Sequence, residues 1–230
     1  MYLWVIIATF VAALAALGTS LRSDIRSVTI NSQAQNIATK LYIQHHGMMG
    51  YAHARIGSGP EGKIGFWPQV WNPKEKDEYK SYLPYGFNPD GGTVQFRSEI
   101  FCFDSQGKGL PVGCQAAGGG ADPAKNCCAQ TGVSIYMVTY GKLPQKWLDI
   151  NSGRPSGDML RAMRNATGFV NGMGYVINSN EYSGNTGKTS MGIISQGQTP
   201  YMPLPEGIIN DKNFSDTCKD NYCLIYMSSM

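Results

Sequence analysis

Six cysteines carry the clearest chemistry in this 230-residue chain. They are Cys102, Cys114, Cys127, Cys128, Cys218 and Cys223. An even number of clustered cysteines, in a chain whose first segment is of an export type, predicts disulfides formed in an oxidising compartment. We expect a local Cys218–Cys223 bridge and pairing among the other four, whose connectivity the spacing leaves open. A zinc site is the alternative, but the chain has no Cys-x-x-Cys pair and no histidine near the cysteines.

The three histidines, His45, His46 and His53, crowd one short stretch that we expect to be the end of a helix. A metal site there is conceivable, but no carboxylate accompanies them within the stretch. Histidines exposed to solvent at a helix end are the more common case, so we predict no metal site. Because no histidine occurs elsewhere, a Ser-His-Asp or Cys-His catalytic site is not expected.

Other catalytic motifs fail on inspection. Gly187-Lys188-Thr189 resembles part of a phosphate-binding loop, but that motif requires a glycine where Tyr182 stands. There is no Gly-x-Ser-x-Gly elbow, and the acidic residues show no glycosidase pattern. Asn165-Ala166-Thr167 and Asn213-Phe214-Ser215 match the glycosylation triplet, which is common by chance. We predict a protein that is not an enzyme, with no catalytic residue and no cofactor.

Composition narrows the class of protein further. Charged residues make up 15 % of the chain, the formal net charge is +3, and the basic residues form no run. Nucleic-acid binding is therefore not expected. The 28 glycines and the many asparagines, serines and tyrosines are typical of an exported domain rich in loops and strands.

The first segment, Tyr2–Leu21, contains no charged side chain. About 20 residues at ~1.5 Å each form a helix of ~30 Å, which matches the hydrocarbon core of a bilayer. The segment is a membrane span, a polymerisation helix or a removable signal. Arg22 and Arg26 follow it and favour a cytoplasmic remainder by the positive-inside rule, whereas the cysteines favour export. We give the cysteines more weight, and we expect a retained anchor with residues 22–230 outside the cytoplasm.

Helical periodicity continues beyond this segment. Apolar residues recur at spacings of three, four or seven, which defines one face of an amphipathic helix. They are Ile30, Ala34, Ile37, Leu41, Met48 and Ala52. Gly47 and Gly50 weaken the last turns by about 1 kcal/mol each. The helix is therefore expected to end between Gln44 and Gly57.

The pattern of the whole chain predicts an α+β fold. In this fold a long N-terminal helix, first hydrophobic and then amphipathic, is followed by a β-rich head that is mostly antiparallel and stabilised by disulfides. We divide the chain into a helix at 1–56 and a head at 57–230, with a cysteine-rich loop region at 102–128 and a compact part at 133–230. Strands are expected at 93–103, 133–140, 169–177, 191–195 and 223–227. Ser156 should cap a helix, and 201–207 should be an extended connector. The aromatic stretch 66–87 either covers the core or forms a ligand-binding surface.

Two short segments add to this layout, Leu143-Pro144-Gln145-Lys146-Trp147 and the connector Leu204-Pro205-Glu206-Gly207-Ile208-Ile209. With the N-terminal helix, they resemble exported proteins of bacterial type IV pilus systems. The resemblance is greatest to the class B and conjugative thin-pilus clusters, which include minor pilins and PilM-like anchored accessory proteins. Two features depart from the pattern. Val5 stands where pilins carry a glutamate, and the cysteine-rich segment is additional.

The resemblance implies a structural or accessory component of a type IV pilus-like assembly, anchored by its N-terminal helix. The implied partners are the membrane through Tyr2–Leu21, other pilus subunits or assembly proteins, and further copies of the chain. The implied location is the bacterial inner membrane facing the periplasm, or an extracellular filament. The competing hypothesis is an anchored or secreted binding or adhesion protein that uses the aromatic surface Phe66–Phe87. A periplasmic enzyme ranks third.

Overall fold

A computed structural model describes most of the helix and the sheet of this chain. The described residues are 2–55, 70–71, 81–88, 91–105, 109–110, 134–149, 151, 155–167, 172–178, 191–195, 201–218 and 223–230. Within the N-terminal helix, side chains are described at positions 9–12 and 28–53. Most of the predicted cysteine-rich loop and of the aromatic stretch lies outside the described residues.

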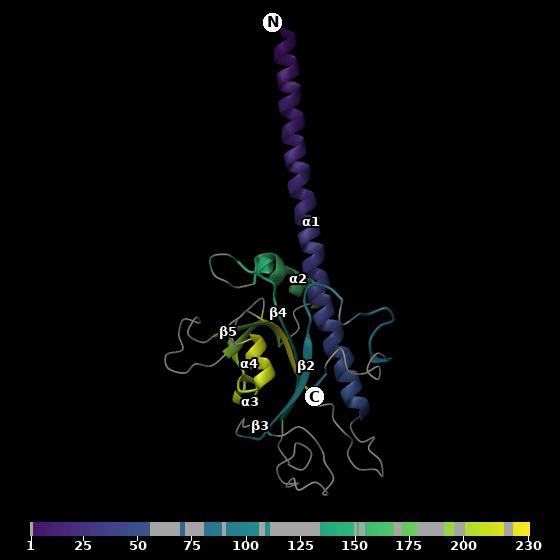
Figure 1. The fold of residues 1–230 in the computed structure, drawn as a ribbon, viewed down its shortest axis with the longest axis vertical. Helices are drawn as coiled ribbons and strands as arrows, with labels where there is room; N and C mark the ends of the chain where they lie inside the picture. Colours follow the sequence, from purple (N-terminus) through teal and green to yellow (C-terminus); the bar gives the residue numbers. More distant parts are fainter. Residues whose placement is uncertain are drawn as a thin grey trace.

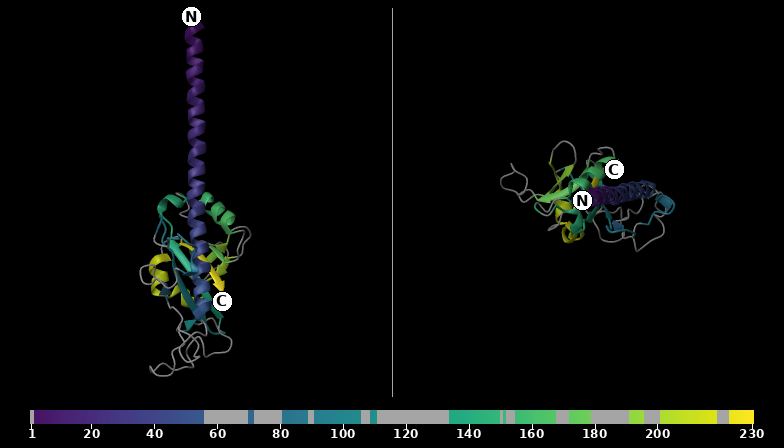
Figure 2. Two further views of the ribbon diagram at one scale, coloured as in Figure 1. Left: turned by 90° about the vertical axis from the view of Figure 1, so that its right-hand side faces the viewer. Right: turned by 90° about the horizontal axis from the view of Figure 1, so that it is seen from above.

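Helix α1 runs without interruption from Tyr2 to Arg55. Its first half projects away from the head, and its second half lies along the head beside the sheet (Figures 1 and 2). The helix ends inside the predicted interval. Among the residues whose side chains are described, which in the first half of α1 are only those at 9–12, no helix has a stretch long and apolar enough to cross a membrane.

The second half of α1 buries the face that the periodicity predicts. Ala34, Leu41 and Ala52 are fully buried there, and Ile37 and Met48 are nearly so. The two glycines inside this part do not break the helix. A Cβ at Gly47 would lie 2.5 Å from Leu83 Cδ2, so glycine at this position permits the 81–83 segment to pack closely against α1.

The strands form one antiparallel sheet in the order β1-β2-β4-β8-β5-β6-β7, and β3 pairs with β2. Their bounds are β1 Val70–Trp71, β2 Arg97–Phe103, β3 Gly109–Leu110, β4 Ser134–Lys142, β5 Met173–Asn178, β6 Met191–Ser195, β7 Tyr201–Pro203 and β8 Cys223–Ser229. Strand β8 lies in the middle of the sheet, between β4 and β5, so the two parts of the sheet are joined only when β8 is in place. The uninterrupted apolar run Cys223–Met227 suits this position, since both faces of a central strand are buried.

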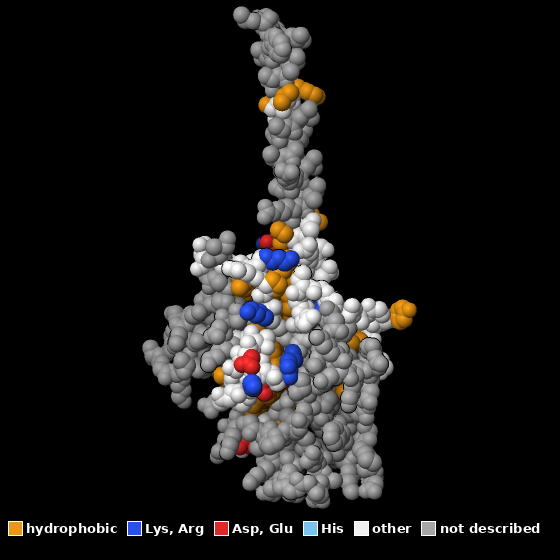
Figure 3. Space-filling model, in the orientation of Figure 1, with side chains coloured by type: hydrophobic (Ala, Val, Ile, Leu, Met, Phe, Trp, Pro, Cys, Tyr) orange, Lys and Arg blue, Asp and Glu red, His pale blue; other side chains and the backbone are white. Residues whose placement is uncertain are grey.

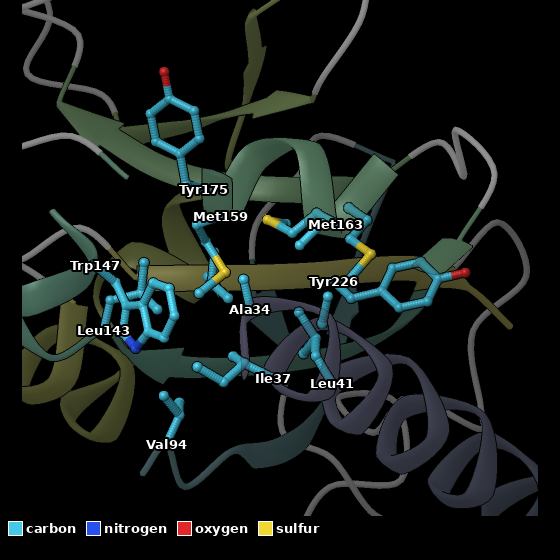
Figure 4. Packing of buried hydrophobic residues seen from close by; sticks show 14 of the residues in the cluster. Ala34, Ile37, Leu41, Val94, Leu143, Trp147, Met159, Met163, Tyr175 and Tyr226 are labelled. Atoms are coloured by element: carbon cyan, nitrogen blue, oxygen red, sulfur yellow. The ribbon is translucent and has the colours of Figure 1, made fainter. Parts of the chain in front are cut away.

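Helices cover both faces of the sheet (Figures 1 and 2). Helices α1 and α2 (Gly157–Thr167) pack on one face, where Leu41, Met159 and Tyr226 belong to one apolar cluster (Figure 4). The short helices α3 (Glu206–Ile209) and α4 (Lys212–Cys218) pack on the other face, around Ile208 and Phe214. The architecture is thus α+β with an antiparallel sheet between two helical layers.

Local hydrogen bonds explain where two helices begin. Ser156 Oγ accepts the backbone N–H of Met159 at 3.4 Å, which confirms the predicted cap of α2. Asp211 Oδ1 accepts the N–H of Phe214 at 2.9 Å and caps α4, a helix that the sequence reading missed. The connector predicted as extended at 201–207 is also partly wrong, because α3 begins at Glu206.

Four strands have bounds that differ from the prediction. Strands β4 and β8 each end two residues later than predicted, at Lys142 and Ser229, and two other strands begin later than predicted. The strand predicted at 93–103 begins only at Arg97, because residues 92–93 form a bend and the carbonyl oxygens of Val94 and Phe96 accept hydrogen bonds from α1 instead. The strand predicted at 169–177 is β5, which begins at Met173 after Gly172. Gly172 has a φ of +86°, and a Cβ there would collide with the carbonyl oxygen of Met227 on β8.

The predicted Cys218–Cys223 disulfide is confirmed, with 5.4 Å between the two Cα atoms. It joins the end of α4 to the start of β8 and so fixes that helix on its face of the sheet. Cys102 on β2 is disulfide-bonded as well. The bonding of Cys114, Cys127 and Cys128 falls outside the described residues.

A glycine on β4 provides a direct test of how closely the sheet packs. A Cβ at Gly141 would lie 2.6 Å from the carbonyl oxygen of Gln95 and 2.7 Å from Phe96 Cδ1. We expect Gly141→Ala to lower the free energy of unfolding by about 1–3 kcal/mol, because backbone as well as side-chain atoms must move. The measurement is denaturant unfolding of the full chain.

Gly157→Ala is the matched control, since a Cβ there meets no atom within 4 Å and the residue lies in the first turn of α2. This variant should be as stable as the original chain or slightly more stable. Equal effects of the two substitutions would contradict the close approach of β4 to the Gln95–Phe96 backbone.

Candidate functional site

A row of polar side chains is buried between α1 and the sheet. Gln44 and His45 on α1 are completely buried, as is Thr139 on β4, and Ser98 on β2 is nearly so. Ser98 and Thr139 are direct cross-strand partners, and Ser228 extends the row onto β8. The row therefore crosses the three adjacent strands β2, β4 and β8 beneath one helix.

Hydrogen bonds connect every member of this polar row. Gln44 Nε2 lies 2.8 Å from the carbonyl oxygen of Phe96 and 3.2 Å from Ser98 Oγ. The Ser98 and Thr139 hydroxyl oxygens are 2.9 Å apart, and Thr139 Oγ1 lies 3.0 Å from His45 Nδ1. The row continues from His45 Nε2 to Ser228 Oγ at 2.7 Å, and from Ser228 Oγ to the sulfur of Met49 at 3.0 Å.

The two ends of the row determine the direction of every hydrogen bond in it. The carbonyl of Phe96 can only accept, so the Gln44 atom that faces it is the donating amide nitrogen. The thioether of Met49 also only accepts, so Ser228 donates to it. All contacts are satisfied together only if each hydroxyl accepts from the Gln44 side and donates toward the Met49 side.

This direction assigns the tautomer of His45. Thr139 donates to Nδ1, and Nε2–H donates to Ser228. A serine that accepts a hydrogen bond from a histidine is not activated as a nucleophile, because a general base must accept the serine proton. The Ser228–His45–Thr139 arrangement is therefore structural, although its distances alone match those of a catalytic triad.

Burial keeps the His45 ring neutral. Desolvation, together with the neighbouring His46, lowers the pKa of His45 from its ordinary value to about 3. The ring stacks on Tyr226 at a centroid distance of 3.8 Å, and burial also lowers the pKa of His46. Burial and the adjacent Tyr42 raise the pKa of Tyr226, whose hydroxyl lies 3.4 Å from His46 Nε2.

The polar row fixes α1 on the sheet in a single register. Each hydrogen bond adds a net ~0.5–1.5 kcal/mol, whereas a buried polar group left unpaired costs ~1–3 kcal/mol. Sliding α1 by one turn of ~5.4 Å would move Gln44 and His45 away from all their partners and bury several unpaired groups. The row thus contributes specificity of position more than net stability.

The prediction that the histidines are exposed to solvent at a helix end is only partly correct. His53 is exposed as expected, but His45 lies in the centre of the interface, because the helix continues past it and the sheet covers it. The ring centroids of His45 and His46 are 5.8 Å apart. Within the described part of the chain, no three His, Cys, Asp or Glu residues gather in a metal-binding arrangement.

A second polar cluster occupies the opposite face of the sheet, around Glu99 on β2. Its carboxylate accepts hydrogen bonds from Arg97 Nε at 2.6 Å, Tyr140 Oη at 2.9 Å and Asn213 Nδ2 at 3.2 Å. Asn213 belongs to α4, so the cluster attaches that helix to the sheet. Asn213 is also the asparagine of one of the two glycosylation triplets, and its side-chain amide donates the hydrogen bond to Glu99.

Burial dominates the electrostatics of this cluster. Desolvation raises the pKa of Glu99, against the opposing effects of the Tyr140 hydrogen bond and of Arg97. Desolvation and the adjacent carboxylate raise the pKa of Tyr140 as well. Both carboxylate oxygens have donors and the side chain is 3 % exposed, so Glu99 serves as an anchor for α4. The role of Glu99 was not predicted, and its only signal in the sequence is a lone acidic residue inside an apolar strand.

Of the aromatic stretch 66–87, the structure describes only strand β1 and residues 81–87. Tyr82 and Tyr85 lie on the surface there, and Tyr82 also contacts the Tyr51 ring of α1 at a centroid distance of 5.5 Å. Comparisons of this chain with protein-family models, with curated proteins and with solved structures find no match.

The tautomer of His45 can be measured directly. Long-range ¹H–¹⁵N NMR on the full chain should show an unprotonated Nδ1 and a protonated Nε2 for His45, because the donor direction of the whole row requires it. A protonated Nδ1 would mean that Ser228 donates to the ring, and it would contradict the assigned direction.

The lowered pKa of His45 predicts acid sensitivity. Because the folded-state value of about 3 lies below the ordinary 6.5, the contribution of the neutral ring is complete above pH 6.5. It is lost progressively as the pH falls from 6.5 toward 3. Between pH 7 and pH 4 we expect the original chain to lose on the order of 3 kcal/mol more unfolding free energy than a His45→Gln variant.

Denaturant unfolding at each pH measures this difference. His53→Gln is the control, since His53 is exposed, and it should follow the original chain at every pH. The raised pKa of Glu99 makes a contribution of the opposite sign, since the stability that Glu99 provides is lost as the pH rises. Glu99 is present in all the proteins compared, so its contribution cancels in the difference between them. Parallel pH profiles for His45→Gln and the original chain would show that His45 is not held neutral by burial.

Proposed function

We propose that this protein is a structural or accessory component of a type IV pilus-like assembly. In this proposal the first half of α1 inserts into a membrane or a helical filament core, and the disulfide-stabilised head makes contacts outside the cytoplasm. The protein acts through these contacts and not as an enzyme. Its partners are other subunits or assembly proteins and further copies of itself.

The observation that carries the proposal is the division of one helix into two environments. From Ala34 to Ala52, α1 belongs to the head core, while the first half projects beyond it (Figure 1). Phe10 and Val11 are 65 % and 58 % exposed on the projecting part. Figure 3 shows hydrophobic side chains on the surface of this part of the helix. An isolated helix is marginally stable in water, and exposed apolar side chains on it are typical of a surface that contacts a membrane or another protein.

Two further features support this function. The uncharged segment Tyr2–Leu21 has the length of a bilayer core and lies wholly within the projecting part. The polar row prevents α1 from sliding on the sheet, so the head keeps a defined position relative to the inserted segment. The Cys218–Cys223 bridge suits an oxidising location outside the cytoplasm.

An anchored binding or adhesion protein is the second candidate. The exposed side chains of Tyr82 and Tyr85 favour it, since surface tyrosines are enriched where proteins meet partners. Both functions use the same anchor, and they differ in whether the protein becomes part of a filament. Recovery of the protein with sheared filaments, as opposed to membranes alone, separates them.

A charge placed on the projecting helix tests the proposal. In the native host, Phe10→Asp should deplete the protein from both the membrane and the filament fractions, because a carboxylate in an apolar core costs about 2.5–3.5 kcal/mol. Ser32→Asp adds the same charge at an exposed position close to the head and should leave the distribution unchanged. Immunoblots of fractionated cells provide the measurement.

The head itself should be unaffected in both variants, and an intact Cys218–Cys223 bridge in non-reducing peptide maps verifies this. Retention of Phe10→Asp in the same fractions as the original chain would contradict insertion of the helix. Recovery of the original chain as a soluble protein cut within residues 13–21 would exclude both a filament and an anchored role.

A further inference from the structure

A pocket of about 370 Å³ opens where α1 enters the head. Gln33, Asn36, Ile37 and Lys40 line it from successive turns of the helix, and the bend Gly91–Val94 forms the opposite wall. Lys146, next to Trp147, closes one side. The volume falls within the range of small-ligand pockets, ~300–1,000 Å³.

The lining of this pocket combines an apolar floor with polar walls. Ile37 and Val94 are almost fully buried, whereas the amides of Gln33 and Asn36 and the hydroxyl of Thr93 are exposed. None of the described lining residues is acidic. Amides and hydroxyls both donate and accept, so they suit the hydroxyl groups of a ligand.

Two lysines give the pocket a positive character. Lys40 Nζ donates to the carbonyl oxygens of Gly91 and Val94, which attaches the bend to α1 and holds the two walls together. Lys146 is exposed, and its ammonium lies 5.3 Å from the centre of the Trp147 ring. Lys146 is therefore positioned at the mouth for an anionic group of a ligand.

Behind the floor lies a buried donor without an acceptor. Trp147 is 3 % exposed, and its indole Nε1–H has no hydrogen-bond partner among the described residues. Figure 4 shows the nitrogen on the side of the ring that faces Val94, and Trp147, Val94 and Ile37 share one apolar cluster. A buried, unpaired N–H costs ~1–3 kcal/mol. Trp147 does not line the pocket, but it packs with Ile37 and Val94, so its ring is a sensitive reporter of any change at the floor.

We propose that this pocket binds a small hydroxylated carboxylate, such as a sugar acid. The carboxylate pairs with Lys146 at the mouth, and the ring hydroxyls bond to Gln33, Asn36 and Thr93. The apolar face of the sugar ring covers Ile37 and Val94. This inference is independent of the pilus proposal, because every residue of the pocket belongs to the head and to the part of α1 packed on it.

Titration of the full chain with galacturonate, followed by ¹H–¹⁵N NMR, tests the inference. At low salt we expect a Kd of about 1 mM or tighter, with the largest shifts at the side-chain amides of Gln33 and Asn36 and a smaller shift at Trp147 Nε1–H. Galactose, which lacks the carboxylate, should bind at least about tenfold more weakly, and so should acetate, which lacks the hydroxyls.

Two substitutions with the same change of charge locate the site. Asn36→Asp places a carboxylate inside the pocket and should weaken galacturonate binding about tenfold or more. Gln35→Glu places one on the neighbouring exposed position, which does not line the pocket, and should change the Kd less than about twofold. The amide spectra of both variants show that the head remains folded.

Three results would overturn the inference. Absence of shifts at the pocket residues at saturating galacturonate would show that it does not bind there. Equal affinity for galactose would exclude an anionic ligand class. Equal weakening by Asn36→Asp and Gln35→Glu would show that a general electrostatic effect, and not this pocket, determines the binding.

Discussion

The contact between α1 and the sheet is the constraint on which the rest of the structure depends. It combines an apolar face, including Leu41 and Tyr226, with the buried polar row from Gln44 to Met49. Apolar packing alone tolerates small shifts, because the hydrophobic effect has no direction. The polar row removes that freedom, because its hydrogen bonds connect α1 to specific atoms of three strands and can all form in one direction only. The second half of α1 is consequently part of the head and not a tether attached to it.

This contact also explains the arrangement of the other elements. With α1 on one face, α2 can cover the remaining apolar surface through Met159 and Met163. The opposite face is closed by α4, which is held by Glu99 and by the Cys218–Cys223 bridge. Because β8 is central, its side chains contribute to the apolar clusters on both faces of the sheet. The projecting half of α1 is thereby oriented by a head whose two faces are each fixed by polar or covalent contacts.

The sequence predicts the repeating features well and the isolated ones poorly. The apolar spacing of α1, the cap at Ser156 and the local disulfide follow from short-range rules, and all three are present. His45 and Glu99 were missed, because a buried polar residue depends on partners that are distant in sequence and has no periodic signal. The pairing of β8 between β4 and β5 was likewise invisible, since strand order is a long-range property.

Hydrogen exchange measured by mass spectrometry on the full chain tests the central claim, that the second half of α1 is an integral part of the head. The amides of residues 34–52 should exchange as slowly as those of β4 and β8, and all three should become exposed together in one cooperative opening. Exchange of residues 34–52 that is faster than that of the sheet, and independent of it, would contradict the claim. It would mean that α1 leaves the head while the head remains folded.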